Sequence, residues 1–93
     1  MDEATFTAFA TAAGCKELYR TAWAPHHGST EHSHDFNAHG LILKGAFTLT
    51  TRQGSQILRA GDTFSLNADS PHFETASAGG VEFLAGRATP GAA

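Results

Sequence analysis

Histidine side chains are concentrated in one part of this 93-residue chain. Five of the six lie within residues 26–39, and the sixth, His72, follows Pro71. In an extended strand alternate side chains share a face, so His32 and His34 would project together and could bind one ion. Imidazole is neutral near pH 7 and is a common ligand of divalent transition metals. The spacing therefore predicts a metal site on this pair.

The other polar side chains of the region give weaker signals. His26 and His27 fit a solvated loop with no ligand role. Glu31 and Asp35 would alternate onto the face opposite the paired histidines. Glu74 shares the face of the last histidine, and this position also fits the rim of a pocket. The pattern therefore predicts metal ligands but no convincing general base.

Length and composition predict one small globular domain. With 93 residues, 41% of them apolar and 16% charged, the chain has the composition of a folded protein with a single core. The net charge is −3 and the basic residues are scattered, so a nucleic-acid-binding surface is not expected. No apolar run approaches the ~20 residues that span a bilayer, and the acidic N-terminus does not resemble a secretory signal.

The chain has a single cysteine, Cys15, which limits the crosslinks and metal sites that it can form. This excludes an intrachain disulfide and a zinc site built from cysteines. A reduced, cytoplasmic setting is the simplest interpretation, with Cys15 as a small buried side chain. We therefore expect a soluble cytoplasmic protein with no membrane or nucleic-acid partner.

The hydrophobic pattern predicts one helix followed by short strands. Residues 2–13 carry Phe6 and Phe9 at helical spacing and end before Gly14. Residues 41–51 alternate, with apolar side chains at odd positions on the face we interpret as inward. Gly45 is predicted to be a bulge or a point of close backbone approach. The other predicted strands are 16–24, where Tyr19 is a packing aromatic, and 55–59, 63–66, 72–75 and 81–85.

Short strands joined by tight turns, without a second helix to connect parallel strands, predict an all-β antiparallel fold. A jelly-roll barrel is the natural closure because it protects sheet edges and leaves a mouth for a ligand. We expect a helix and lead-in over residues 1–15, the barrel over 16–87 and a frayed tail over 88–93.

Several short motifs support this fold together. His32-x-His34, Gly45 after a strand, Gly61-Asp62 and Ser70-Pro71-His72 resemble the two linked motifs of small single-domain cupins. The resemblance runs from about Trp23 to Arg87. It implies that His32 and His34 are ligands of one metal ion and that His72 brings a third imidazole from a facing strand.

The departures from the cupin pattern bear on the chemistry. Cupins commonly carry a glutamate three or four residues after the second histidine of the first motif, where this chain has Ala38 and His39. His39 shares the parity of the inward face, which makes it a candidate fourth ligand; a bulge near Gly40 or Gly45 would instead turn it outward. His26, where glycine is usual, and the pair Asn67 and Asp69, where proline and glycine are usual, indicate altered loops.

A site of three or four neutral histidines leaves a bound ion its full charge and open positions for a substrate. All-histidine cupins include oxygenases, so the resemblance implies a metal-dependent, dioxygenase-like oxidoreductase acting on a small oxygen-chelating substrate. The cofactor would be one divalent Fe, Mn, Ni, Cu or Zn ion, between which spacing cannot choose. The alternatives are a non-catalytic ligand-binding or sensor module and a cupin isomerase.

Two further expectations concern neighbours of the site and assembly. Phe36 and Phe73 adjoin the ligand-bearing stretches and are the candidate pocket residues. The apolar side chains of the N-terminal helix and first strand (Phe6, Phe9, Leu18 and Trp23) exceed what a small core would cover, which predicts a homodimer. Cupin resemblance implies the same.

Overall fold

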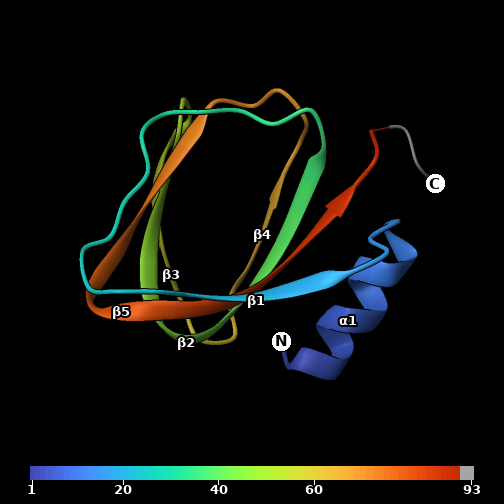
Figure 1. The fold of residues 1–93 in the computed structure, drawn as a ribbon, viewed down its shortest axis with the longest axis horizontal. Helices are drawn as coiled ribbons and strands as arrows, with labels where there is room; N and C mark the ends of the chain where they lie inside the picture. Colours follow the sequence, from blue (N-terminus) through green and yellow to red (C-terminus); the bar gives the residue numbers. More distant parts are fainter. Residues whose placement is uncertain (91–93) are drawn as a thin grey trace.

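The computed structural model describes residues 1–90 as one helix followed by antiparallel strands (Figure 1). The elements are α1 (Glu3–Ala12), β1 (Leu18–Trp23), β2 (Asn37–Thr51), β3 (Gly54–Arg59), β4 (Thr63–Leu66) and β5 (His72–Ala88). Every pairing between these strands is antiparallel. The predicted all-β jelly-roll with a short N-terminal helix is therefore confirmed.

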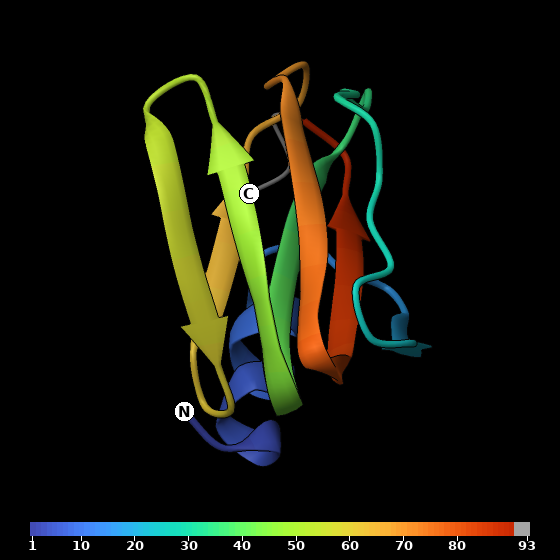
Figure 2. The same ribbon diagram turned by 90° about the vertical axis from the view of Figure 1, so that its left-hand side faces the viewer.

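The long strands β2 and β5 each contribute to both walls of the barrel. In one wall, the first half of β2 pairs with β4 and with the second half of β5, and β1 completes this wall on the far side of β5. In the other wall, the second half of β2 pairs with β3 and with the first half of β5. Figure 2 shows the two walls as facing layers. Side chains that point between them form the interior.

Both long strands bend where they pass from one wall to the other. The pairing of β2 with β5 shifts register between Ile42 and Lys44 and again between Gly45 and Phe47. Gly45 has φ +71°, and a Cβ at this position would lie 2.2 Å from the carbonyl oxygen of Gly80. Only glycine combines this conformation with such a close approach. The bend therefore depends on this residue.

The bend also changes which residues of β2 face inward. Ile42 belongs to the interior cluster, whereas Leu41 packs on the outside under α1. After the bulge, Phe47 and Leu49 point inward. The prediction that odd positions face the interior is thus correct beyond Gly45 and wrong before it, because the two register shifts move the alternation by one residue.

One predicted turn between strands is absent. Residues 72–75 and 81–85 were expected as two strands separated by a turn, but β5 runs without interruption from His72 to Ala88. Gly80, with φ +78°, bends this strand instead of ending it. Ala88, expected to begin the frayed tail, is the last residue of β5 and is buried. The tail residues 91–93 lie outside the described part of the chain.

Two apolar clusters stabilise the fold. The first fills the barrel and consists of Ile42, Phe47, Leu49, Leu58, Leu66, Ala76, Val81 and Phe83. The second lies between α1 and the outer face of the wall that contains β1, and consists of Phe6, Ala10, Cys15, Leu41, Leu84 and Ala88. Cys15 is buried, as expected. The helix thus covers the outside of the barrel and leaves its mouth free (Figure 1).

Polar contacts stabilise the N-terminal end of α1. The Asp2 side chain caps it by accepting a hydrogen bond from the backbone N–H of Thr5 (2.7 Å). The Met1 ammonium donates to the carbonyl oxygen of Gly61, and Arg20 pairs with Glu3 at 2.9 Å. Within residues 1–90, this helix is not long and apolar enough to cross a membrane, and no other helix is present there.

The predicted homodimer rested on four apolar side chains, and one chain already covers most of them. Phe6 is fully buried, Leu18 packs against the cluster under α1, and Trp23 packs against the barrel interior. Phe9 remains 45% exposed. The homodimer stays a prediction, and the exposed apolar surface that supports it is smaller than expected. Sedimentation at micromolar concentration would test it.

Candidate metal centre

Three histidines converge at the mouth of the barrel. His32 and His72 form an isolated antiparallel bridge in which each backbone N–H donates to the carbonyl oxygen of the other at 2.9 Å. Their rings lie 4.4 Å apart, and the ring of His34 lies 4.8 Å from that of His32. One ring nitrogen from each histidine falls within 4.8 Å of the others. The structure therefore brings together the three residues predicted as ligands.

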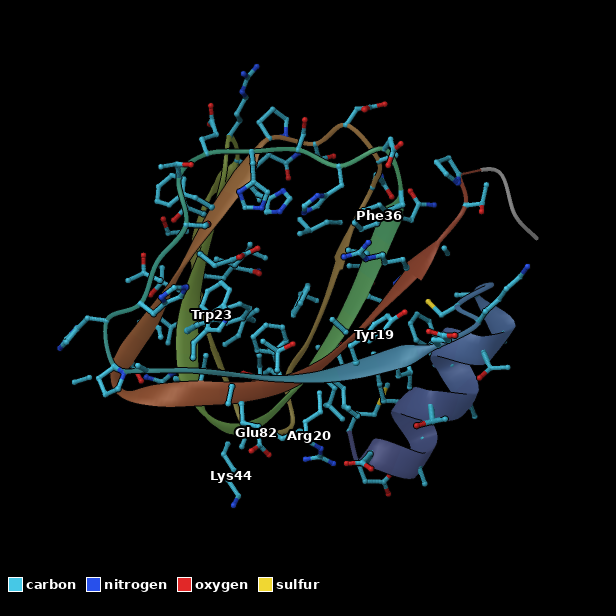
Figure 3. The ribbon with its side chains drawn as sticks, viewed as in Figure 1. Tyr19, Arg20, Trp23, Phe36, Lys44 and Glu82 are labelled. Carbon is cyan, nitrogen blue, oxygen red and sulfur yellow. The ribbon has the colours of Figure 1, made fainter. Side chains whose placement is uncertain are left out.

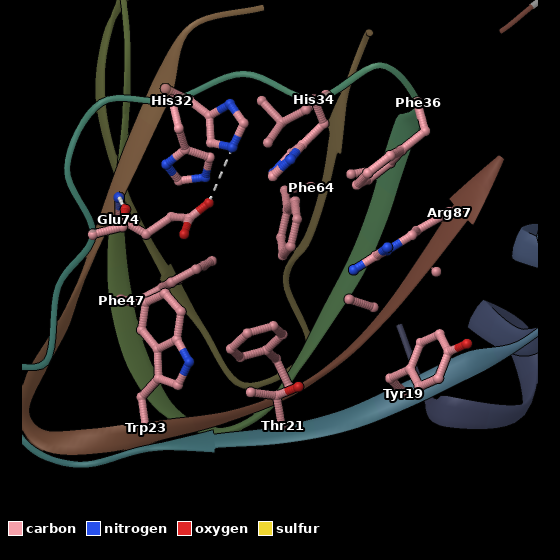
Figure 4. Close-up of a pocket in the computed structure, with 17 residues that line it drawn as sticks. Tyr19, Thr21, Trp23, His32, His34, Phe36, Phe47, Phe64, Glu74 and Arg87 are labelled. Carbon is pink, nitrogen blue, oxygen red and sulfur yellow. Dashed lines mark hydrogen bonds and ion pairs between the residues drawn. The ribbon is translucent and has the colours of Figure 1, made fainter. Parts of the chain in front are cut away.

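Backbone pairing, rather than a regular strand, places these side chains. The segment that carries His32 and His34 is a loop between β1 and β2, anchored by the bridge to His72 and by the Asp69 N–H, which donates to the carbonyl oxygen of His34 at 2.7 Å. Strand alternation was therefore the wrong reason for pairing His32 with His34. The loop nevertheless brings both rings within 5.2 Å of the His72 ring, and Figure 4 shows His32 and His34 side by side at the cavity.

Two of the rings are oriented by backbone carbonyl groups. His32 Nδ1 lies 2.7 Å from the carbonyl oxygen of Thr30, and His72 Nδ1 lies 2.8 Å from that of Ser70. A carbonyl oxygen only accepts hydrogen bonds, so each Nδ1 carries a proton and Nε2 is the nitrogen through which the neutral ring can bind a metal. Metal-binding histidines typically have such a partner on the nitrogen remote from the ion. The pair is thus prepared to bind through Nε2.

Burial favours the neutral form of His34. It lowers the pKa of His34, and the neighbouring His32 and His72 lower it further. The His72 side chain is 2% exposed. Because only neutral imidazole coordinates a metal, the surroundings favour the form of His34 that binds near pH 7.

The spacing of the three nitrogens is compatible with one metal ion. Two nitrogens that bind the same ion at about 2.1 Å can be at most about 4.2 Å apart. The nitrogens here lie within 4.8 Å of one another. Small rotations of the rings would bring them into coordination distance, so the donor set fits a divalent transition metal.

A carboxylate lies beside the three histidines. Glu74 Oε1 is 3.4 Å from His72 Nε2 (Figure 4), and the Glu74 side chain is only 13% exposed. Burial raises the pKa of Glu74, and the nearby His72 and His32 oppose that change. The expected glutamate of the first cupin motif is missing, but Glu74 supplies a carboxylate from β5. Strand parity predicts that Glu74 shares the face of His72, which the structure confirms, but does not predict whether it lies inside the cavity or at its rim.

The histidines open onto a cavity of about 340 Å³ inside the barrel. Aromatic rings form much of its wall, and Figure 3 shows Trp23 and Phe36 directed toward it. The aromatic lining residues are Tyr19, Trp23, Phe36, Phe47, Phe64 and Phe83. The lining also contains one carboxyl side chain, Glu74, and one guanidinium, Arg87. An apolar cavity with a few polar groups is typical of small-molecule sites.

The two predicted pocket phenylalanines have different positions. Phe36 lines the cavity and stacks on His34, with ring centroids 4.6 Å apart. Phe73 does not line it and is 37% exposed. The reason is strand alternation: His72 points inward, so its neighbour in β5 must point outward. Phe73 was predicted to line the pocket because it is next to His72 in sequence. Its position in the strand instead directs it to the opposite face.

His39 does not join the other histidines. Its ring packs edge-on against Phe9 of α1 at 5.3 Å, and its Nδ1 is hydrogen-bonded to the Ser65 hydroxyl at 2.8 Å. Ala38, the preceding residue, lines the cavity instead. The prediction that His39 faces inward is wrong, because the bulge at Gly45 shifts the alternation of β2. This was the alternative stated from the sequence.

Two other histidines lie away from the centre, as expected. His26 and His27 are exposed, and neither belongs to the group of converging ring nitrogens within residues 1–90. His27 packs edge-on against Trp23 at 4.8 Å. Sequence reasoning missed Arg87 as a lining residue. Its parity with Phe83 and Ala85, which also line the cavity, could have identified it.

The family model for the cupin domain matches residues 19–85, which is most of the chain. This chain belongs to the cupin family. The match contains the three histidines, the bulge at Gly45 and all but the ends of the strands described above. No curated protein sequence matches this cupin.

Solved structures confirm the cupin fold. A protein of unknown function from Rhizobium leguminosarum bv. viciae has a TM-score of 0.73 at 10% identity, over 77% of this chain and 68% of its own. A cupin protein from Bacteroides fragilis gives 0.71 at 23% identity, over 82% and 67%. A cupin superfamily protein from Desulfitobacterium hafniense gives 0.67 at 16% identity, over 80% and 79%. At these identities the likeness concerns the fold alone.

Proposed function

We propose that this cupin binds one divalent transition-metal ion per chain through His32, His34 and His72. The observation that carries the proposal is the orientation of His32 and His72, whose Nδ1 atoms are held by backbone carbonyls so that Nε2 is the nitrogen left for a metal ion, with the Glu74 carboxylate 3.4 Å from that of His72. Iron, manganese, nickel, copper and zinc all bind imidazole, so the residues do not select one of them. His39 is not included in the ligand set.

We further propose that the ion serves a dioxygenase-like oxidoreductase that acts on a small oxygen-chelating substrate. When bound by three neutral ligands, such an ion supplies Lewis-acid and, for most of these metals, redox chemistry with open coordination positions. The chain itself would hold the ion and position the substrate against the aromatic wall of the cavity. In this proposal Glu74, whose carboxylate lies 3.4 Å from His72 Nε2, accepts a proton from a substrate hydroxyl.

The position of Glu74 also favours a second candidate, an isomerase that moves a proton. A carboxylate within reach of a metal-polarised substrate could remove a proton from carbon and return it to another atom. Such a reaction would need no oxygen. A non-catalytic ligand-binding role is the third candidate and requires neither the carboxylate nor open coordination positions.

Metal analysis and two activity assays separate these candidates. Protein purified without an affinity tag or added metal should contain close to one divalent ion per chain, and the His32→Ala/His72→Ala variant should contain almost none. Oxygen uptake with candidate diketones, thiols or flavonols would support the oxidoreductase. Deuterium exchange from solvent into a carbonyl substrate without oxygen uptake would favour the isomerase. Metal binding with neither activity would leave the binding module.

A further inference from the structure

A cation lies at the side of the cavity remote from Glu74. Arg87, near the end of β5, lines the cavity together with Phe36 at the start of β2. Its guanidinium carbon lies 4.7 Å from the centroid of the Phe36 ring. In Figure 4 the side chain extends into the cavity from the right-hand wall, while Glu74 extends from the left. The two charged groups thus define two ends of one site.

The contact with Phe36 relates the position of the exposed Arg87 side chain to that of the histidines. Phe36 lies between the two, because its ring stacks on His34 at 4.6 Å with an interplanar angle of 14° and also contacts the guanidinium. A guanidinium placed over an aromatic ring keeps its N–H donors at its edge, where they can bind a planar anion. Arg87 forms no ion pair with a carboxylate of residues 1–90.

The floor between the two ends is apolar and aromatic. Phe47, Phe64 and Phe83 contact one another, with ring centroids 5.5 to 6.4 Å apart, and all three line the cavity. A ligand in this cavity would therefore meet imidazole and carboxylate at one end, aromatic rings along its middle and a cation at the other end.

We propose that Arg87 binds a carboxylate of the ligand, and that the ligand is a small organic acid with an apolar or planar middle and an oxygen donor at its other end. The Arg87 contact follows from the cavity alone, whereas the placement of the oxygen donor rests on the metal site proposed above. The planar, bidentate donor geometry of arginine matches a carboxylate better than a neutral amide. Arg87 is thus a specificity-determining residue.

A matched pair of probes tests this assignment. The acid 3,4-dihydroxybenzoate and its neutral analogue 3,4-dihydroxybenzamide share two chelating hydroxyl groups and differ in charge at the opposite end of the ring. Calorimetric titration of the zinc-loaded protein should show the acid binding about tenfold more tightly than the amide. Arg87→Gln should remove this preference by weakening the acid alone, and Arg87→Lys should retain part of it.

The controls separate Arg87 from the metal and from folding. Arg59→Gln changes an arginine on β3 outside this cavity and should leave the preference unchanged. Arg87→Gln should keep the zinc affinity and thermal stability of the natural protein. The same titrations on metal-free protein should give weaker binding with the same preference for the acid. Failure of zinc to bind would overturn the proposed metal site, and the metal-free titrations would still decide the role of Arg87.

Three results would overturn the Arg87 proposal. The natural protein could bind acid and amide equally. The preference for the acid could persist in Arg87→Gln while the variant remains folded. Neither probe could bind at millimolar concentration, with or without zinc. Loss of the preference in Arg87→Gln but not in Arg59→Gln would support the proposal.

Discussion

The wall that contains β1 has two faces with different chemistry, although the same strands build both. Along the second half of β5, Phe83, Ala85 and Arg87 line the cavity, while Leu84 and Ala88 pack under α1. Alternation of side chains separates the two sets residue by residue. One face therefore carries aromatic and charged groups around an open space, and the other forms a closed apolar contact.

The contrast extends to two histidines whose surroundings both disfavour a positive charge. Burial lowers the pKa of His34 and of His39. His34 lies beside two other imidazoles at the cavity, whereas His39 packs against Phe9 and is hydrogen-bonded to Ser65. Burial alone therefore does not mark a metal ligand. Several donor atoms directed at one point do, and only the cavity face provides them.

The largest expected difference between the faces is in metal affinity. His32→Ala/His72→Ala should lower it by more than about 100-fold, since even the partners of metal-binding histidines contribute about 10- to 100-fold. His39→Ala should leave it unchanged, because this ring lies under the helix. Competition with a chromophoric chelator would measure both. Equal losses in the two variants would contradict the division of the histidines between the faces.

The next difference is in stability, where the helix face should dominate. Phe6 is fully buried between α1 and the barrel, so Phe6→Ala should lower the free energy of unfolding by about 3–5 kcal/mol. Phe9→Ala, at a side chain that is 45% exposed, is the matched control and should cost less. Urea denaturation of metal-free protein measures both. A similar loss in the two variants would show that the helix contact is not centred on Phe6.

Much of the architecture could be predicted from the sequence because local signals were consistent. Asp2 and Gly14 bracket the helix, and the turn residues between 51 and 63 delimit β3 and β4. The bridge between His32 and His72 joins residues 40 positions apart in sequence. Strand periodicity does not predict a contact over that separation, so the grouping of His32 and His34 with His72 came from the spacing of the motifs. Family resemblance supplied that long-range contact.

The errors in the faces of β2 and in the extent of β5 share one physical cause, the bend in the two long strands. A bulge at Gly45 reverses the faces of the residues before it, which moved His39 outward and Ala38 inward. Gly80 bends β5 where a turn was expected. A single residue inserted into the pairing reverses every assignment by parity on one side of it, so a small local uncertainty became an error at the site.

This dependence on the bend is itself testable. Gly45→Ala would place a Cβ 2.2 Å from the Gly80 carbonyl oxygen at φ +71°, and should lower the free energy of unfolding by about 1–3 kcal/mol from backbone strain, with the contact adding to the loss. Gly79→Ala is the control, since no heavy atom lies within 4 Å of a Cβ built there. Urea denaturation should show a clear loss only for Gly45→Ala. Equal stability of the two variants would contradict the assigned bend.

The smallest expected effect is the contribution of His39 to the pH dependence of stability. Because burial lowers the pKa of His39 from its ordinary value of 6.5, the unfolded chain binds more protons than the folded one below that value. The associated stability is present above pH 6.5 and is lost as the pH falls toward the folded-state pKa. His39→Gln should therefore reduce the loss of stability between about pH 7.5 and 5.5 in metal-free protein. His34, whose pKa is lowered in the same direction, remains in both proteins, so the difference isolates His39.

His26→Asn, at an exposed position with φ 62° that asparagine tolerates, should leave the pH dependence as it is. If His39→Gln left it unchanged as well, the helix face would not hold His39 in its neutral form.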